Sequence, residues 1–588
     1  MRFSRAQRYL VFAAGPRRLL LYGIAIMVLF GLAGAPLLAF RTETKYLVKR
    51  TALVLSSIEV PFAVHPSPQH APLASSQAGL TAPATGPLRV NPANPRYFTD
   101  GSGRAIYLTG SHTWLNLQDG VLTDPPPAFD YAGWLDFLVS HNHNFFRLWV
   151  WEQAKWVVEW PDPYYFYPHP YLRTGPGNAL DGKPKFDLTQ FNQAFFDRLR
   201  QRVSQAGQRG IYVSIMLFDG WSVVYPKGMY GAANPWEGHP YNANNNINGI
   251  DGDPNADGSG TETQTLAIAQ ITALQEQYVR KVIDTVNDLD NVLYEISNES
   301  DGGSEQWQYH MIDFIHAYEA GKPKQHPVGM TVEWPNGDNA DLFASNAEWI
   351  SLNGSLDQPP AADGRKVIIA DTDHLCGICG DRQWVWKSFT RGENPLFMDQ
   401  YDDSYKLEGG GYDTGNPNDV SLRRNLGYTL SFANRMNLVA MTPRGDLASS
   451  GYCLANPAAS GAEYLVYLPD GGTVTVDLSA SPGQLSFEWF KPEQGAVVAT
   501  GTTSGGVTRS FSAPGDGDAV LYLFAPGAAE PSATPTLAGS PTSTSSPLPG
   551  PTGTPTPLPS PTASSTVTAS HTPAATGPFC PCLPLIHR

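Results

Sequence analysis

Residues 291–300 read NVLYEISNES, and this stretch decides the fold. Its first part, VLYEIS, is a short apolar run typical of a buried strand, and the run ends in Asn298 and Glu299. Seven more runs of this type occur along the chain. They are apolar on both faces, as parallel strands are. The predicted strands cover residues 105–110, 145–151, 211–218, 292–297, 327–332, 349–353, 366–370 and 395–399.

Segments with helical spacing of apolar residues separate several of these strands. Residues 191–207, 265–289 and 307–320 precede the third, fourth and fifth strands. Eight strands with intervening helices fit a (β/α)8 TIM barrel, an α/β fold of typically about 250 residues. We assign this barrel to residues 88–445. After a last helix at 421–436, strands separated by Gly, Asp and Pro predict a small antiparallel β-sandwich at 446–526.

The two ends of the chain have a different composition. Residues 19–40 are uncharged and apolar over a length that spans a bilayer, and arginines precede them in 1–18, the expected cytoplasmic end. A cleaved signal peptide is the alternative. Residues 41–87 are expected to be a linker, and the Pro/Thr/Ser-rich residues 527–588 a disordered tail. The barrel is therefore expected outside the cytoplasm, either membrane-anchored through residues 19–40 or secreted.

The overall composition limits the classes of molecule that this protein is expected to bind. The 588 residues carry a net charge of −15, which repels nucleic acid, and 14 tryptophans offer flat apolar faces on which sugars stack. We expect a monomer that acts on carbohydrate and binds no nucleic acid.

Polar and aromatic residues follow the predicted strands. In this type of barrel the chemistry lies at the C-terminal ends of the strands. A barrel with a purely structural role would not need so many carboxylates, amides and aromatic rings at one end. The candidate substrate-binding residues are His112, Trp114, Arg147, Trp149, Asp219, Trp221, Asn298, Trp334, His374, Asp399 and Tyr401.

Three stretches resemble known families. A fourth strand ending in Asn298-Glu299 resembles clan A of the glycoside hydrolases, and Arg147 matches the arginine of that clan. The stretch RVNPANPRYFTDGSGRAIYLTGSHTW (89–114) resembles the start of apiosidase-like glycosidases, and the closing sandwich resembles a collagen-binding-type domain. The resemblance implies that Glu299 is the catalytic acid/base, that Asn298 contacts the sugar 2-hydroxyl, and that Arg147 supports the nucleophile.

The nucleophile departs from the clan pattern. The clan has a Glu at the end of the seventh strand, whereas here that strand runs into Asp371 and Asp373. Asp371 aligns best and Asp373 next, with Asp399, Glu333 or no nucleophile as the remaining readings. Carboxyl groups about 5–5.5 Å apart give retention, and about 6.5–9.5 Å gives inversion. A retaining reaction through Glu299 and Asp371 or Asp373 is the leading expectation.

Two further motifs bear on cofactors. Cys376 and Cys379 are expected to form a local disulfide, with a metal site as the alternative. The loop 251–262 has oxygen ligands at calcium-loop spacing, although position 6 is Ala256 rather than Gly, and a solvated turn-rich loop is the alternative. The reaction itself requires no cofactor. The candidate calcium ligands are Asp251, Asp253, Asn255, Asp257 and Glu262.

Two other functions compete with the glycosidase. One is a non-catalytic carbohydrate- or matrix-binding surface protein on a TIM-barrel scaffold, which the missing seventh-strand Glu favours. The other is a metal-dependent hydrolase that uses His112, Asp371, Asp373 and His374.

Overall fold

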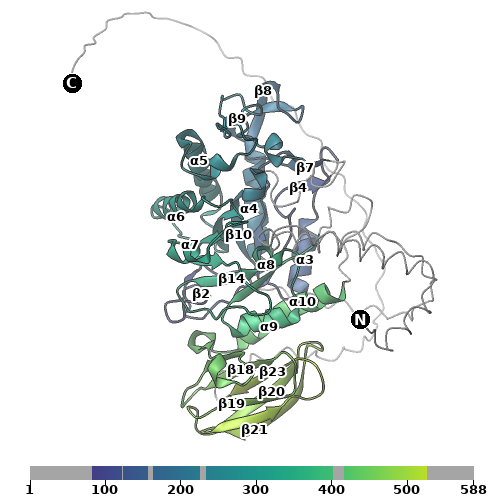
Figure 1. Ribbon diagram of the computed structural model, residues 1–588, viewed down its shortest axis with the longest axis vertical. Coiled ribbons are helices and arrows are strands. Elements are labelled where there is room, and N and C mark those ends of the chain that lie inside the picture. The colour runs from purple at the N-terminus through teal and green to yellow at the C-terminus, as the bar shows by residue number, and fades with distance from the viewer. Residues whose placement is uncertain (1–81, 122, 157–162, 225–232, 402–415, 526–588) are drawn as a thin grey trace, which may run out of the picture. The chain divides into compact units, whose positions relative to one another are not determined.

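The computed structural model describes residues 82–525, except 122, 157–162, 225–232 and 402–415 (Figure 1). The expected membrane segment 19–40 and the expected tail 527–588 lie outside the described residues. Among the helices of the described part, none is both long and apolar enough to cross a membrane.

Eight parallel strands form a nearly closed barrel, in the order β3-β15-β14-β13-β12-β11-β10-β5. The two end strands are joined just before they start, where the Asn144 amide donates to the Thr109 carbonyl at 3.0 Å. Consecutive strands are neighbours, as the TIM-barrel prediction requires. The strands are β3 (Gly110–His112), β5 (Phe145–Leu148), β10 (Tyr212–Asp219), β11 (Val292–Asn298), β12 (Val328–Thr331), β13 (Trp349–Ser351), β14 (Val367–Asp371) and β15 (Asn394–Met398).

All eight predicted strands are therefore confirmed, and one is displaced. The first was expected at 105–110 but begins at Gly110. The apolar residues before it are used elsewhere, because Ile106 forms an antiparallel bridge with Phe98. That bridge extends the small sheet of β1 (Arg89–Val90) and β2 (Phe98–Thr99).

The predicted helices also form, and they pack around the barrel (Figure 1). In α4, the residues Phe195, Leu199 and Val203 recur at helical spacing and are buried, while Asn192 caps the helix by accepting from the Ala194 amide. The helices are α3 (Tyr131–Ser140), α4 (Gln193–Gly207), α5 (Ala269–Val286), α6 (Glu305–Glu319), α7 (Asn339–Ala344), α8 (Thr372–Cys376), α9 (Arg382–Thr390) and α10 (Pro417–Arg435).

Long connections at one end of the barrel carry additional strands that the sequence did not predict. They form a three-stranded sheet and the hairpin β8–β9, which Figure 1 shows at the far end of the barrel. Short 3-10 helices, including η2 (Gly220–Ser222) and η3 (Pro235–Gly238), lie in the same region of the chain. The additional strands are β4 (Asp119–Val121), β6 (Lys155–Trp156), β7 (Tyr164–Tyr167), β8 (Tyr171–Asn178) and β9 (Pro184–Phe191).

An antiparallel sheet domain follows the barrel, as expected. Its six-stranded sheet has the order β16-β17-β18-β23-β20-β21, and β19 pairs with β22. Val474 and Phe511 of the small sheet share a core with Val466 of the large one, so the two sheets pack face to face. The strands are β16 (Thr442–Pro443), β17 (Cys453–Asn456), β18 (Glu463–Leu468), β19 (Thr473–Asp477), β20 (Gln484–Lys491), β21 (Ala496–Ser504), β22 (Thr508–Ser512) and β23 (Ala519–Phe524).

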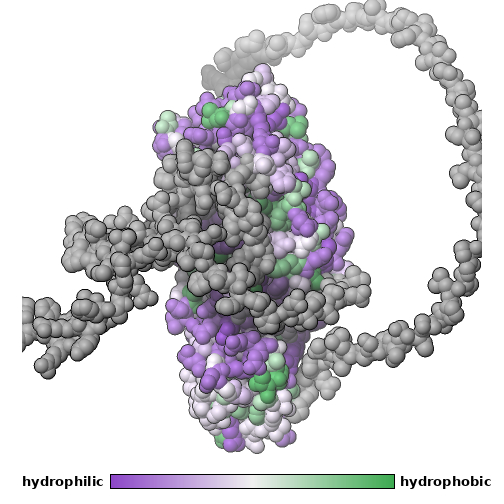
Figure 2. Space-filling view, turned by 90° about the vertical axis from the view of Figure 1, so that its right-hand side faces the viewer, coloured by the Kyte–Doolittle hydropathy of each residue, from purple (hydrophilic) through white to green (hydrophobic). Residues whose placement is uncertain are grey.

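The sheet domain and the barrel share a second core. Trp386 of α9 is fully buried and stacks on Tyr467 of β18, with ring centroids 6.2 Å apart. Beside this stack, Arg382 pairs with the buried Asp518 at 3.1 Å. Over the face seen in Figure 2, hydrophilic residues predominate and apolar ones are scattered, which fits a surface in contact with water.

Candidate active site

A single buried arginine organises the C-terminal end of the barrel. Arg147 of β5 is 1% exposed, and its guanidinium donates to groups from three other parts of the barrel. It bonds Glu295 of β11 through Nε at 2.8 Å and also through Nη2. Nη1 lies 2.9 Å from both Asp371 and Asp373, and Nη2 lies 2.7 Å from the side-chain oxygen of Asn298. The arginine therefore ties the ends of the fourth and seventh strands together.

The carboxyl groups around Arg147 differ in their protonation behaviour. Burial by itself would raise the pKa of Asp371, but the charges of His112 and Arg147 outweigh it and hold that pKa well below its usual range. Burial raises the pKa of Asp373, and the neighbouring Asp371 adds to this effect although Arg147 opposes it. The two aspartates of one strand end thus differ, with Asp371 the firmly ionised member.

His112 holds Asp371 from the opposite side. Its Nε2 lies 3.0 Å from an Asp371 oxygen, and its ring stacks on Trp149 with centroids 5.7 Å apart. The Asp371 side chain also caps α8 by accepting from the Asp373 amide at 3.0 Å. The Asp371 side chain is fully buried among these contacts, so its position is fixed by its surroundings.

His374 and Asn298 link the same cluster to the fourth strand. His374 lies 2.7 Å from the Ser351 hydroxyl through Nδ1 and 3.3 Å from the Asn298 side-chain oxygen through Nε2. Burial and the charge of Arg147 lower the pKa of His374 to about 3, so the ring is neutral. A neutral ring that accepts from Ser351 donates its Nε2 proton to Asn298.

Glu299 lies at the end of the same strand, against an aromatic wall. Its backbone has φ = 44°, a conformation that residues other than glycine rarely adopt. The indole N–H of Trp221 donates to Glu299 Oε2 at 2.6 Å, and Trp221 stacks on Trp334 with centroids 5.4 Å apart and planes 13° apart. Strained backbone of this kind is concentrated at functional sites.

Asp219 is fully buried at the end of the third strand, behind Asn298. It accepts from the Asn298 amide at 3.4 Å and lies 2.9 Å from the Ser222 hydroxyl. Burial raises the pKa of Asp219 to about 7, with the nearby Glu152 adding to the rise. Asp219 has no exposed surface and bonds Asn298, and its role toward a substrate stays a prediction.

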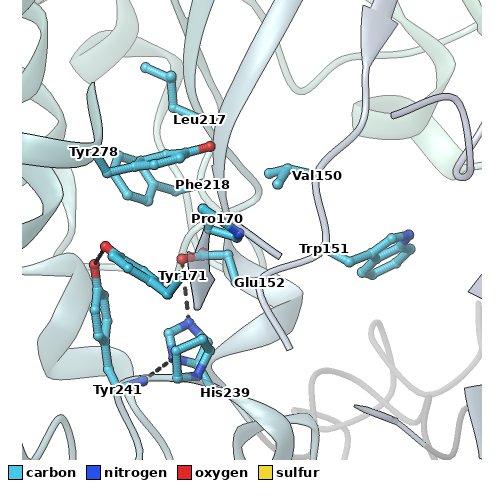
Figure 3. Close-up of a pocket in the computed structure, with 11 residues that line it drawn as sticks. Val150, Trp151, Glu152, Pro170, Tyr171, Leu217, Phe218, His239, Tyr241 and Tyr278 are labelled. Atoms are coloured by element: carbon cyan, nitrogen blue, oxygen red, sulfur yellow. Dashed lines mark hydrogen bonds and ion pairs between the residues drawn. The ribbon is translucent and has the colours of Figure 1, made fainter. Parts of the chain in front are cut away.

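A small hollow beside this group is lined mainly by aromatic rings (Figure 3). Glu152 crosses it, accepting from the Asp219 amide at 2.9 Å and lying 3.3 Å from His239. The hydroxyls of Tyr171 and Tyr241 bond each other at 2.9 Å across the other side. The hollow lies between the barrel strands and the long connections that carry Tyr171, His239 and Tyr241. Through its contacts with Asp219 and His239, Glu152 links these connections to the strand ends.

The remaining predicted site residues have structural contacts. Asp399 forms a buried ion pair with Arg423, whose Nε lies 2.7 Å away, and Tyr401 packs its ring against Phe137. The Trp114 carbonyl accepts from the Trp151 indole at 3.0 Å. Their roles toward a substrate stay predictions.

Two site residues were missed from the sequence. Glu295 lies inside the fourth strand, and Glu152 follows the second. For Glu295 the available signal was a charged residue within a run that is otherwise apolar on both faces, since a carboxylate there must be paired. Nothing comparable marked Glu152.

Of the two predictions made from the cysteine pair and the acidic loop, one is confirmed and the other stays a prediction. The Cys376–Cys379 disulfide is confirmed. In the loop 251–262, Asn255 donates to Asp257 at 3.0 Å and also to Glu262, and Ala256 has φ = 60°. Across the described residues, no group of three or more His, Cys, Asp or Glu side chains is placed to hold a metal ion. Calcium binding by the loop stays a prediction.

Fold and site together define a (β/α)8-barrel protein with a carboxylate cluster at the C-terminal end of the barrel and an antiparallel sheet domain behind it. Residues 158–341 match the family described as "Domain of unknown function (DUF6298)". Residues 448–523 match the "Putative collagen-binding domain of a collagenase", which confirms the domain type expected at this position. No curated protein matches the chain.

Solved structures similar to this chain include glycoside hydrolases. A family 5 glycoside hydrolase from Bacteroides vulgatus is 13% identical, with a TM-score of 0.47 over 75% of this chain and 93% of that chain. A family 5 mannosidase from Rhizomucor miehei is 12% identical, with a TM-score of 0.36 over 59% and 98%. An α-amylase from Geobacillus thermoleovorans is 11% identical, with a TM-score of 0.37 over 67% and 91%.

Proposed function

We propose that this protein is a glycoside hydrolase of an extracellular poly- or oligosaccharide, with Glu299 as acid/base and Asp371 or Asp373 as nucleophile. The observation that carries the proposal is the position of Arg147. One guanidinium bonds both aspartates of the seventh strand and also Asn298, the residue before Glu299. Glycoside hydrolysis needs two carboxyl groups that flank one bond, and this arginine ties the two strand ends that carry them.

The surroundings of Glu299 suit a sugar. Trp221 and Trp334 stack nearly in parallel beside it and are both partly exposed. Flat aromatic faces bind the apolar faces of sugar rings. Glu299 itself is 6% exposed, so the carboxyl group sits in a largely desolvated place from which it can pass a proton to a leaving oxygen.

Between the two aspartates, accessibility favours Asp373 as nucleophile, whereas the pKa shifts favour Asp371, because burial raises the pKa of Asp373. Both oxygens of Asp371 are engaged, by His112, by Arg147 and by the Asp373 amide, and its side chain is fully buried. Asp373 accepts a single hydrogen bond, from Arg147, within the described residues, and its side chain is 7% exposed. Attack on an anomeric carbon needs a carboxylate oxygen that the substrate can reach. In this scheme Asp371 holds Arg147 and His112 in place.

The reaction then has two steps. Asp373 attacks the anomeric carbon while Glu299 donates its proton to the leaving oxygen, which gives a covalent glycosyl-enzyme. Glu299 next takes a proton from water, and that water releases the sugar from Asp373. This course gives retention and requires about 5–5.5 Å between the two carboxyl groups.

Turnover of a panel of aryl glycosides tests the assignment. Glu299→Gln is expected to lower kcat/KM by about 10²–10⁴-fold, because it removes proton transfer to the leaving group. The loss should shrink on a dinitrophenyl glycoside, whose leaving group needs little protonation. The matched control is Glu276→Gln, because the Glu276 carboxylate lies on α5, 2.9 Å from His310, and has no role in the scheme.

The nucleophile is tested in the same assay. Asp373→Asn should abolish turnover on every aryl glycoside, including the dinitrophenyl one, while NMR of the wild-type product shows the retained anomer. Full activity of Glu299→Gln, or of Asp373→Asn, would overturn the corresponding role. An inverted product would overturn the covalent step.

One observation favours the non-catalytic alternative, which is the missing seventh-strand Glu. Wild-type protein that binds oligosaccharides but turns over none of the panel would support that reading. The metal-dependent alternative loses support, because the Arg147 guanidinium lies between Asp371 and Asp373, where a metal ion would have to bind.

The location of the enzyme belongs to the same proposal. The apolar run 19–40 and the arginines before it support a location of the barrel outside the cytoplasm. Protease accessibility of the barrel in intact cells, with and without detergent, tests this placement. Size-exclusion chromatography with light scattering tests the expected monomer.

A further inference from the structure

A second cleft lies away from the strand ends, between the barrel and the sheet domain. Its barrel side is formed by Gln383 and Lys387 of α9 and by Gln358. Its other side is formed by residues 449–452 and by the turn 468–474 between β18 and β19. The volume is about 450 Å³, within the roughly 300–1,000 Å³ of small-molecule sites.

The walls of this cleft are tied together. Gln383 of the barrel donates to the Pro469 carbonyl at 3.1 Å, and the Tyr452 hydroxyl donates to the Asp357 carbonyl at 3.4 Å. The buried ion pair of Arg382 with Asp518 lies in the same interface. A cleft held in this way is formed before a ligand arrives, which reduces the entropy cost of binding.

Lys387 is the cation that lines this cleft, and Asp470 is the carboxylate that lines it. The Lys387 ammonium lies 5.9 Å from the Tyr452 ring centroid, and the Arg391 guanidinium lies 5.0 Å from the same centroid. Among the residues that the structure describes, no carboxylate forms an ion pair with either cation. Burial raises the pKa of the nearby Glu393 to about 8, so that group is neutral at pH 7. The chain as a whole carries −15, which makes this cationic spot a local exception.

Hydroxyl and amide groups surround the cation. Ser449, Ser450 and Thr473 line the sheet-domain side, and Gln358 is exposed on the barrel side. Asp470 also lines the cleft and is exposed. Such a mixture of donors and acceptors around an aromatic ring suits a ligand rich in hydroxyl groups. Because Lys387 forms no ion pair with a described carboxylate, its ammonium can bond one negative charge on that ligand, against the repulsion of the exposed Asp470.

We propose that this cleft is a second carbohydrate-binding site, which takes an oligosaccharide carrying a carboxylate, with Lys387 bonding the carboxylate. The site is separate from the cluster around Arg147. Binding there would hold the end of an acidic polysaccharide against the protein whatever reaction the barrel performs.

Calorimetric titration of the whole protein with tri-galacturonate and with neutral cellotriose tests this proposal. Tri-galacturonate is expected to bind, more weakly as salt rises, and Lys387→Gln should weaken it by about tenfold. Lys281→Gln is the matched control, because Lys281 lies on α5 and bonds Gln193 at 3.2 Å. Ser450→Trp, which fills the cleft, should abolish the same binding.

Because the barrel end is unaltered in all three variants, a loss confined to Lys387→Gln and Ser450→Trp belongs to the cleft. Unchanged unfolding temperatures of the variants exclude a folding defect. Equal affinity of wild type and Lys387→Gln would overturn the proposal, as would no binding of tri-galacturonate. Binding of a Pro-Pro-Gly repeat peptide that Ser450→Trp abolishes, without sugar binding, would assign the cleft to a peptide and overturn it too.

Discussion

Arg147 shows why the site depends on the identity of one residue. All five of its N–H groups have acceptors, because Nε bonds Glu295, Nη1 bonds Asp371 and Asp373, and Nη2 bonds Glu295 and Asn298. A lysine has three donors on one atom and cannot reproduce this planar fork. The positions of the Asp373 carboxylate and of the backbone before Glu299 therefore depend on the same side chain.

The buried carboxyl group of Asp219 predicts how the stability of the protein varies with pH. The folded protein keeps the Asp219 proton up to about pH 7, whereas an unfolded chain loses it near the ordinary value of 3.8. Between these values the unfolded state binds fewer protons, so the free energy of unfolding falls as pH rises, by up to about 1.4 kcal/mol per pH unit. Asp219→Asn should remove this contribution, because an amide does not titrate.

Urea unfolding of wild type and Asp219→Asn at pH 5, 6, 7 and 8 measures the difference. The variant is expected to gain stability relative to wild type as pH rises from 5 to 7. Asp197→Asn serves as control, because that carboxylate is exposed on α4. Parallel pH dependence in all three proteins would contradict the proton held by Asp219.

The residues that sequence reasoning missed share one physical cause. A strand pattern shows that VLYEIS is buried, but it does not show which partner neutralises Glu295. That partner, Arg147, is 148 residues away in the chain. The exposure of Asp373 could not be predicted either. It exceeds that of Asp371 because α8 begins at Thr372, which makes Asp371 the helix cap and places Asp373 in the first turn.

At the scale of elements, the barrel strands were predictable because parallel strands must be apolar on both faces. The additional strands were not, since only Tyr171 and Gly175 of β8 are buried, and β8 pairs only with its neighbour β9. Short, polar strands of this type lack a period that distinguishes them from loops. The strand β8 nevertheless supplies Tyr171, while His239 and Tyr241 come from the loop that follows η3.

Close packing between two barrel strands predicts that a larger residue at Gly329 of β12 destabilises the protein. This glycine is paired with Trp349 of β13, and an added methyl group would lie 1.8 Å from the indole ring. Trp349 is fully buried and has no room to retreat. Gly329→Ala should therefore cost at least about 3 kcal/mol of unfolding free energy, at the upper end of overpacking effects.

Denaturant unfolding monitored by far-UV circular dichroism checks this value. Gly321→Ala is the matched control, because its nearest neighbour would lie at an ordinary 3.9 Å. A loss below about 1 kcal/mol at Gly329 would mean that the two strands pack less tightly than the structure has them.

At the scale of the whole molecule, the shared core joins barrel and sheet domain into one folding unit. Trp386 contacts Tyr467 and Phe490 of the sheet domain, and its indole N–H bonds Asn425 of the barrel at 2.8 Å. Separating the domains would expose this aromatic cluster to water, at roughly 25 cal/mol per Å² of apolar surface. We therefore expect calorimetry of the whole protein to give one unfolding transition, with equal calorimetric and van't Hoff enthalpies.

The ion pair between Arg382 and Asp518 tests whether the barrel and the sheet domain unfold together. Asp518→Asn removes the carboxylate that Arg382 and the Tyr467 hydroxyl both bond at 3.1 Å. Because Arg382 is partly exposed, we expect a loss of about 2 kcal/mol rather than the 3–5 kcal/mol of a fully buried pair. The single transition should move down by roughly 2–3 °C. Asp516→Asn, two residues away and exposed, should leave it unchanged. If Asp518→Asn instead splits the transition in two, the domains fold separately, and the cleft between them would not be formed before its ligand binds.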